Sequence, residues 1–355
     1  MLPPGSATRD RATSKPVTDF VARLGSSAGT RSLRTAAGLT IGFALLLISV
    51  VVQAGDAPQR LPLSEARWLL PGPQRLISLS TAPVECYKAP ADAQDRIAAE
   101  IGRIAFRTPL LLGGPAAKAG LSCQSCHVNV HDNPAFHLDG LSGAPGTVDA
   151  TSDLFSKTRG DGVFNPIPIP SLIERVRLRR QQGAEGQAAI ARFVHGVVVD
   201  EFQGAAPTPA VFDALLAYVG SLDPSACPTP AVQPIRLQDD WQTIERGALS
   251  LQAAMDRSDT AVADFLIIAL RSLLGHIHQR FELPGLKPAQ TRLLDLSQEL
   301  GRIREQNLNA PQDANAALKR WRDRLAGSGK LLARYESRSL YDAGQLEALL
   351  GKKGL

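Results

Sequence analysis

Cys123-Gln124-Ser125-Cys126-His127 is the most informative stretch of this chain. Two thiols three residues apart, followed directly by a histidine, are typical of a c-type haem attachment site. On a helical turn the sulfurs point to one face and can bond the two vinyl positions of one porphyrin, with His127 under the iron as proximal ligand. A zinc site would need a second Cys/His pair at ligand spacing, and a thioredoxin-like CxxC would need a βαβ setting; neither is present. We therefore predict one covalently bound haem c.

The other two of the four cysteines, Cys86 and Cys227, lie one on each side of this motif. Haem is attached outside the cytoplasm in bacteria, and an oxidising compartment allows disulfides. A Cys86–Cys227 bond would tie together the two ends of the haem region. The alternative is two unpaired, buried thiols, and the sequence leaves both open.

Length and composition indicate a mostly globular chain with room for two domains. The chain has 355 residues, of which 44% are hydrophobic and 21% are charged. The net charge is +5, but the basic residues are spread out. A nucleic-acid-binding protein would need a clustered basic face, so we expect no nucleic-acid partner.

The N-terminus has the pattern of a targeting region. Residues 1–35 are rich in Ser, Thr, Ala and Arg and are expected to be disordered. The uncharged run 36–54 ends in Val52-Gln53-Ala54, which suits signal-peptide cleavage, and it is also nearly long enough to span a bilayer. Positive charge in front of it predicts that everything after it lies outside the cytoplasm. We expect the protein on the periplasmic side of the bacterial inner membrane, either anchored by this segment or secreted.

Helical patterns dominate the rest of the chain, so the predicted fold class is mainly α. Residues 55–90 are Pro-rich and are expected to form a linker, either a tether or a wrapping extension. Apolar residues at helical spacing predict helices over 92–106 and 209–222, inside a haem domain at 91–228. The same spacing throughout 235–355 predicts a second, bundle-like domain of four or five helices.

The order of these features resembles two families. A helix with Gly102 and Phe106, then CxxCH, a long loop and a last helix with Tyr218 looks like a class I cytochrome c domain. In that family the first and last helices cross, so Gly102 would allow the close approach and Tyr218 would supply the ring at the crossing. A finer resemblance is to a single haem module of the bacterial di-haem cytochrome c peroxidases. It is carried by GLSCQSCH (120–127), AFHLDGL (135–141), GDGVFNPIPIPSL (160–172) and FVHGVVVDEFQG…VFDALLAYVGSLD (193–223).

One departure from the peroxidases bears on function. Those proteins carry two haems, whereas this chain has a single CxxCH and no cysteine after residue 235. An electron relay between two covalently attached haems within the chain is therefore excluded.

The sixth iron ligand is predicted to be a histidine rather than a methionine. Met1 precedes the membrane segment, and Met255 falls on an amphipathic pattern where core packing is the better interpretation. By the resemblance, His195 stands where related modules supply methionine, and His137 lies in a loop that could fold over the ring. His131 would project from the same side as His127 and so could not easily reach the far face. A five-coordinate iron is the remaining alternative.

Three further features are candidates for contacts around the haem. Arg107 and Arg159 could pair with the propionates. The second nitrogen of a proximal histidine is commonly held by a backbone carbonyl, which the stiff segment 165–170 could offer. By family analogy, Pro166 or Pro168 would lie nearest.

These observations favour an electron-transfer cytochrome that works with redox protein partners. One alternative is a peroxidase-like enzyme with an open iron site, in which Glu201, His137 or His195 acts as distal acid or base. Another is a haem-based sensor or scaffold whose C-terminal helices bind a partner. The sequence does not identify the electron donor or acceptor.

Overall fold

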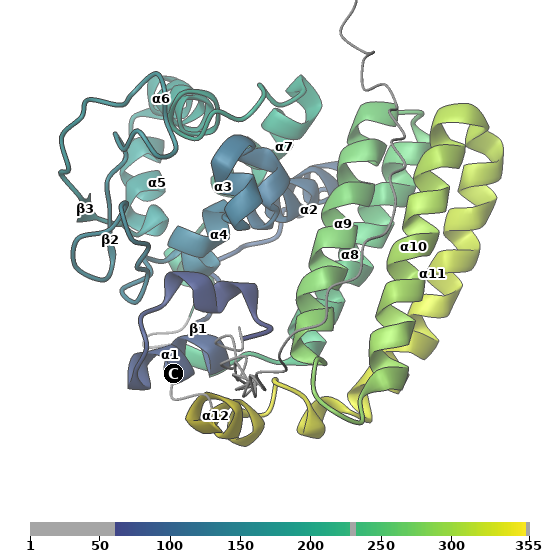
Figure 1. The fold of residues 1–355 in the computed structure, drawn as a ribbon. Helices are drawn as coiled ribbons and strands as arrows, with labels where there is room; N and C mark the ends of the chain where they lie inside the picture. The colour runs from purple at the N-terminus through teal and green to yellow at the C-terminus, as the bar shows by residue number, and fades with distance from the viewer. Residues whose placement is uncertain (1–60, 228–231, 353–355) are drawn as a thin grey trace, which may run out of the picture. The chain divides into compact units, whose positions relative to one another are not determined.

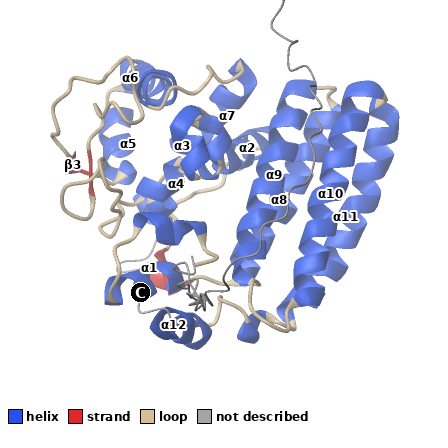
Figure 2. Ribbon diagram, in the orientation of Figure 1, coloured by secondary structure: helices blue, strands red, loops and turns tan. Residues whose placement is uncertain are grey.

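The structure, a computed structural model, describes residues 61–227 and 232–352. Its regular structure is almost entirely helical, which confirms the mainly α prediction (Figure 1, Figure 2). The described residues form one compact unit. The predicted disordered region 1–35 and the predicted signal or anchor 36–54 lie outside the described residues.

The described part of the predicted linker, 61–90, is folded. It contains a 3-10 helix (Ser64–Trp68), helix α1 (Pro73–Ser80) and strand β1 (Thr81–Pro83), which pairs antiparallel with β4 (Val232–Pro234). Its apolar side chains form a small core with the C-terminal helix α12 (Ala343–Lys352); the buried members are Leu63, Leu69, Leu79, Ala135, Leu340, Leu346 and Leu350. Because these leucines are buried, this segment is a wrapping extension and not a tether.

Helices α2 (Ala93–Arg107) and α7 (Pro209–Gly220) cross in direct contact. A Cβ atom on Gly102 would lie 1.9 Å from the carbonyl oxygen of Ala214, so only glycine allows this approach. Tyr218 is fully buried, and its ring centroid lies 5.4 Å from that of Phe106. The close approach at Gly102 and the aromatic ring at the crossing are therefore both present.

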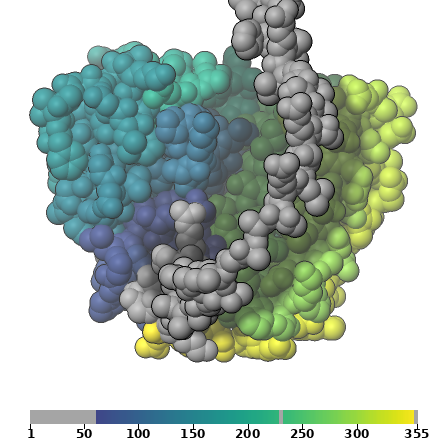
Figure 3. All heavy atoms as spheres, viewed as in Figure 1, coloured from purple at the N-terminus to yellow at the C-terminus, as the bar shows by residue number. Residues whose placement is uncertain are grey.

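The residues between α2 and α7 are mostly loops joined by short elements. These are 3-10 turns at Pro109–Leu111 and Val128–Val130, helices α3 (Gly114–Ala119), α4 (Cys123–Cys126), α5 (Leu172–Arg180) and α6 (Gly183–Gly196), and the paired strands β2 (Thr147–Val148) and β3 (Ile167–Pro168). A single turn of π-helix, Val197–Glu201, continues α6. The space-filling view shows side chains of this region, in teal, at one side of the face and the C-terminal helices, green to yellow, at the other (Figure 3).

Four long helices follow: α8 (Leu237–Asp256), α9 (Thr260–Arg280), α10 (Lys287–Asn309) and α11 (Pro311–Ala333). Successive helices pack side by side and α11 returns to α8, which forms a four-helix bundle (Figure 1). Trp321 is fully buried in it and donates a hydrogen bond to the carbonyl of Leu296 at 3.0 Å. Helix α2 packs against α8, so the predicted haem region and the bundle share one core.

Among the described residues, α9 is long and apolar enough to cross a membrane. It also packs between α8 and α10, and Leu266, Ile267 and Leu270 are fully buried there. Packing in the bundle core accounts for its composition.

Candidate haem-attachment site

The CxxCH motif forms one tight turn. Helix α4 runs from Cys123 to Cys126, and the backbone N–H of His127 donates to the carbonyl of Cys123 at 2.8 Å. Ser122 begins the turn, with its backbone N–H donating to Ser125 Oγ at 3.1 Å. Residues three apart on a helical turn are neighbours on one face, so the two thiols lie together with the imidazole directly after them.

The four cysteines divide into one bonded pair and one free pair. Cys86 and Cys227 are joined by a disulfide, whereas Cys123 and Cys126 are free and half-buried. Burial raises the pKa of Cys123 to about 12 and raises that of Cys126 further, and the charge of Glu201 adds to both shifts. Both thiols are therefore protonated at neutral pH and react slowly unless another agent activates them.

His127 has the protonation state that an iron ligand needs. Burial lowers its pKa to about 4, against smaller opposing effects of the Pro170 backbone and the charge of Asp132. The ring is therefore neutral at pH 7 and has a lone pair available for a metal. The segment 165–170 does approach this ring, but through Pro170 rather than Pro166 or Pro168.

One ring nitrogen of His127, Nδ1, is buried without a hydrogen-bond partner in the described part of the chain. Within the described residues, Nδ1 is buried and makes no hydrogen bond of normal geometry, although the Pro170 backbone lies close enough to influence the ring. Buried polar atoms of this kind are uncommon and call for an explanation. A small movement of the ring towards Pro170 on metal binding would satisfy Nδ1.

Glu201 and Arg159 form an ion pair near the two free thiols. Arg159 Nη1 donates to Glu201 Oε2 at 3.0 Å, and Glu201 stands at the end of the π-helical turn. Burial raises the pKa of Glu201 to about 7, although Arg159 opposes the shift. The negative charge of Glu201 raises the pKa of both thiols, so its carboxyl group acts electrostatically on the motif, and Arg159, one of the two predicted propionate partners, is bound to that carboxyl group.

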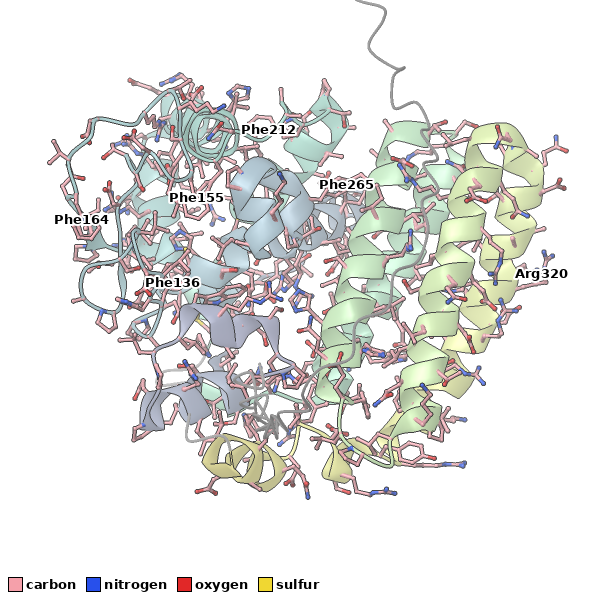
Figure 4. All side chains as sticks on the ribbon, in the orientation of Figure 1. Phe136, Phe155, Phe164, Phe212, Phe265 and Arg320 are labelled. Carbon is pink, nitrogen blue, oxygen red and sulfur yellow. A yellow bond between two sulfur atoms is a disulfide. The ribbon has the colours of Figure 1, made fainter. Side chains whose placement is uncertain are left out.

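The residue that follows Glu201 belongs to a buried aromatic pair. Phe202, the next residue, packs against Phe155 with ring centroids 5.8 Å apart, and both rings are buried. Figure 4 shows Phe155 among other side chains, whereas Phe164 of the same long loop lies at the outer edge of the view. The cause of the raised pKa is the burial of the Glu201 side chain, which is 13% exposed.

Arg107, the other predicted propionate partner, is engaged by protein groups. Its Nη2 donates to Glu85 Oε1 at 2.8 Å and to Asn129 Oδ1 at 3.2 Å, and its Nη1 donates to the carbonyl of Arg103 at 3.2 Å. Burial alone would raise the pKa of Glu85, but Arg107 and Arg103 outweigh it and hold this pKa at about 2. Arg107 is thus the partner of a buried carboxylate and of the loop after His127.

The histidines considered as sixth ligand lie in three different settings. His195 is exposed at the end of α6, with its ring edge-on to Phe212 at a centroid distance of 5.9 Å. His137 Nε2 lies 3.1 Å from Asp139 Oδ1, and within the described residues its buried Nδ1 has no partner. His131 Nε2 lies 3.0 Å from the carbonyl of Val84 and 3.5 Å from Cys86 Sγ, beside the disulfide.

Two other features could suggest a ligand site. Ligand atoms of Cys86, His131 and Cys227 lie within 4.8 Å of one another, but the disulfide uses both thiols. A hollow on the bundle mixes basic and acidic side chains, and Arg324 and Glu299 in it pair at 2.5 Å. The disulfide leaves no free thiol in the first feature, and opposite charges line the second, so neither suggests a ligand site as directly as the CxxCH turn does.

Two residues next to the site were not anticipated from the sequence. Glu85 stands beside a cysteine in the chain, but nothing in its neighbourhood predicts burial of its carboxylate. Asn129 follows the motif closely, and asparagine is enriched where the backbone has positive φ. That preference is the one sequence signal that could have identified it.

No protein-family model matches this sequence, and no curated protein or solved structure matches it either. The functional argument therefore depends on the residues and geometry described above.

Proposed function

We propose that this protein is a monohaem c-type cytochrome that transfers electrons. Haem c would be held by Cys123 and Cys126, with His127 as proximal ligand. The observation that supports this best is the division of the cysteines: the two thiols of the motif are free on one turn beside a neutral imidazole, while the other two are bonded to each other.

The residues of the site have complementary tasks in this proposal. Haem, when bound, supplies one-electron redox chemistry. The two thiols fix its position covalently, and His127 offers a lone pair at neutral pH. Arg159 provides a positive charge beside the motif that suits a propionate, with Glu201 as its present partner.

We propose a histidine as sixth ligand, with His195 first and His137 as the alternative. The protein would act on the periplasmic side of the bacterial inner membrane, anchored or delivered by residues 36–54, and exchange electrons with redox protein partners. Substituting each histidine by alanine separates the two ligands, because loss of the true ligand converts a low-spin ferric spectrum into a high-spin one.

The test of haem attachment is direct. The full chain, produced in a host with the haem-attachment machinery, should retain haem after denaturing electrophoresis and show the mass of one haem. The Cys123→Ser/Cys126→Ser variant should lose both signals, and the matched Cys86→Ser/Cys227→Ser variant should keep them. A wild-type chain with no stain and two unmodified thiols would overturn the proposal.

A peroxidase-like enzyme is the second candidate, and the state of Glu201 favours it. A buried carboxyl with a pKa near 7, beside the motif and paired with Arg159, suits a general acid or base at neutral pH. An open iron would give a high-spin ferric spectrum that cyanide shifts, and Glu201→Gln would then lower peroxide turnover. A low-spin spectrum unaffected by cyanide would exclude this candidate and support electron transfer.

A further inference from the structure

The backbone just after His127 is strained. Asn129 has φ 48° and ψ 42°, and Val130 has φ 70°. Asparagine adopts positive φ more readily than most residues, whereas positive φ is a genuine outlier for a β-branched residue such as valine. Such a conformation is unfavourable and persists only where the surroundings enforce it.

Asn129 is held by four hydrogen bonds. Its Oδ1 accepts from Arg107 Nη2 at 3.2 Å and from Gln124 Nε2 at 3.1 Å. Its Nδ2 donates to the carbonyl of Pro83 at 2.8 Å, and its backbone N–H donates to Gln124 Oε1 at 3.1 Å. Gln124 lies between the two cysteines of the motif, so these contacts, here called the Asn129 clamp, connect the start of the CxxCH turn to the residue two places after His127.

The clamp is anchored at the crossing of α2 and α7. Arg107 belongs to α2 and pairs with Glu85 at 2.8 Å, and Tyr218 of α7 donates to the same carboxylate at 2.5 Å. Arg103, one turn earlier on α2, also pairs with Glu85. The side chains of Arg107 and Glu85 are only 12% and 9% exposed, so water competes little for these hydrogen bonds.

A second branch reaches the bundle. Glu100 of α2 lies 3.5 Å from Arg103 and 3.4 Å from Arg246 of α8. A continuous set of charged contacts therefore extends from the bundle to Arg107 and Asn129, which gives the C-terminal helices a physical connection to the motif.

We propose that Asn129 is a positioning residue for His127, which sets the direction of the imidazole through the strained turn and is itself fixed by Arg107 and Glu85. This inference rests on the proposed haem function. Residues outside the ligand set that orient a metal-bound histidine tune the metal strongly. Without the clamp, residues 129–130 relax towards negative φ, and the ring loses its fixed direction. With haem bound, His127 would then hold the iron less firmly, and the reduction potential would rise because an imidazole ligand stabilises ferric iron.

The test compares three substitutions in the haem-loaded full chain. Asn129→Gly removes all side-chain contacts of residue 129 and leaves its backbone free to adopt either sign of φ. Arg107→Met removes one donor of the clamp. Asn129→Asp keeps both acceptor contacts of the side chain. We expect a higher midpoint potential and altered ferric EPR g values for Asn129→Gly and Arg107→Met, and recovery towards wild type for Asn129→Asp.

Arg304→Met is the matched control. It removes the two-contact ion pair with Asp264, at 2.5 and 3.1 Å, between α10 and α9, and should leave potential and g values unchanged. Haem-bearing, folded Asn129→Gly and Arg107→Met chains with wild-type potential and g values would overturn the inference while leaving the proposed function intact. A wild-type chain without haem would overturn both.

Discussion

At the scale of single residues, Glu201 should make stability depend on pH. Its pKa is raised to about 7 by burial, compared with 4.5 for an ordinary glutamate. The folded chain therefore binds this proton more tightly than the unfolded chain, and the resulting stability is complete below about pH 4.5 and is lost as pH rises through about 7. Glu201→Gln removes this loss.

The measurement is urea unfolding of the haem-free Cys123→Ser/Cys126→Ser chain at pH 5 and pH 8, with and without Glu201→Gln. The additional substitution should increase the free energy of unfolding by about 2–3 kcal/mol more at pH 8 than at pH 5. Glu174→Gln, at an exposed glutamate of α5, serves as the control. Equal effects of Glu201→Gln at the two pH values would contradict the assignment.

The two arginines considered for propionate contact show what residue-level reasoning from sequence can and cannot do. Both lie within a few tens of residues of the motif, and nothing in the sequence distinguishes them. The difference arises in three dimensions, because Glu85 is buried against Arg107, whereas Arg159 pairs with Glu201 beside the free thiols. Ion pairs between residues that are far apart in the sequence cannot be predicted from the sequence alone.

At the scale of elements, the crossing of α2 and α7 should tolerate no side chain at residue 102. In Gly102→Ala the new Cβ meets the backbone of Ala214 at 1.9 Å, so the helices must separate. We expect a loss of about 2–4 kcal/mol in the free energy of unfolding, more than the gain in helix propensity.

Gly275→Ala provides the comparison for that experiment. Gly275 is an exposed residue of α9 with open space around its Cβ position. Alanine there should stabilise the chain by about 0.5–1 kcal/mol, because it only improves helix propensity. Urea denaturation of both variants checks the pair, and equal changes for the two would refute the packing argument.

Regular helices were predictable from periodicity, and irregular turns were not. The expected helix 92–106 corresponds to α2, and Asp92 caps it by accepting from the backbone N–H of Gln94 at 2.7 Å. The π-helical turn Val197–Glu201 has no such signal, because one extra residue in a turn leaves the apolar spacing almost unchanged. That turn positions Glu201, so part of the site could not be foreseen.

At the scale of the whole molecule, the disulfide should contribute strongly to stability. It joins residues 141 positions apart, and closing so long a loop restricts the unfolded chain. Cys86→Ser/Cys227→Ser should lower the free energy of unfolding by about 2–5 kcal/mol. Urea unfolding with and without a phosphine reductant tests this: the reductant should destabilise the wild type and leave the double variant unaffected. A wild type insensitive to full reduction would disprove it.

Individual helices were easier to predict from the sequence than the packing between them. Residues 55–90 were predicted to be a linker because they contain several prolines and lack apolar periodicity. The few leucines in this segment, such as Leu63 and Leu79, are buried only because they pack with α12. The Pro-rich stretch before residue 235 predicted a boundary between two helical domains, yet α2 packs against both α7 and α8. Packing between segments far apart in the sequence has little effect on the residue pattern within each segment, so it is hard to predict from that pattern.

The pairing of β1 with β4 sets an order of events during synthesis. Ala82 aligns with Gln233, 151 residues later, so a ribosome that adds about 5–20 residues per second needs on the order of ten seconds or more to supply the partner. During that interval Cys86 coexists with Cys123 and Cys126 before Cys227 has been made. A growing chain exposed to an oxidant in that interval could bond Cys86 only to Cys123 or Cys126. The native Cys86–Cys227 disulfide therefore requires that Cys123 and Cys126 stay reduced, or react with another group, before Cys227 emerges.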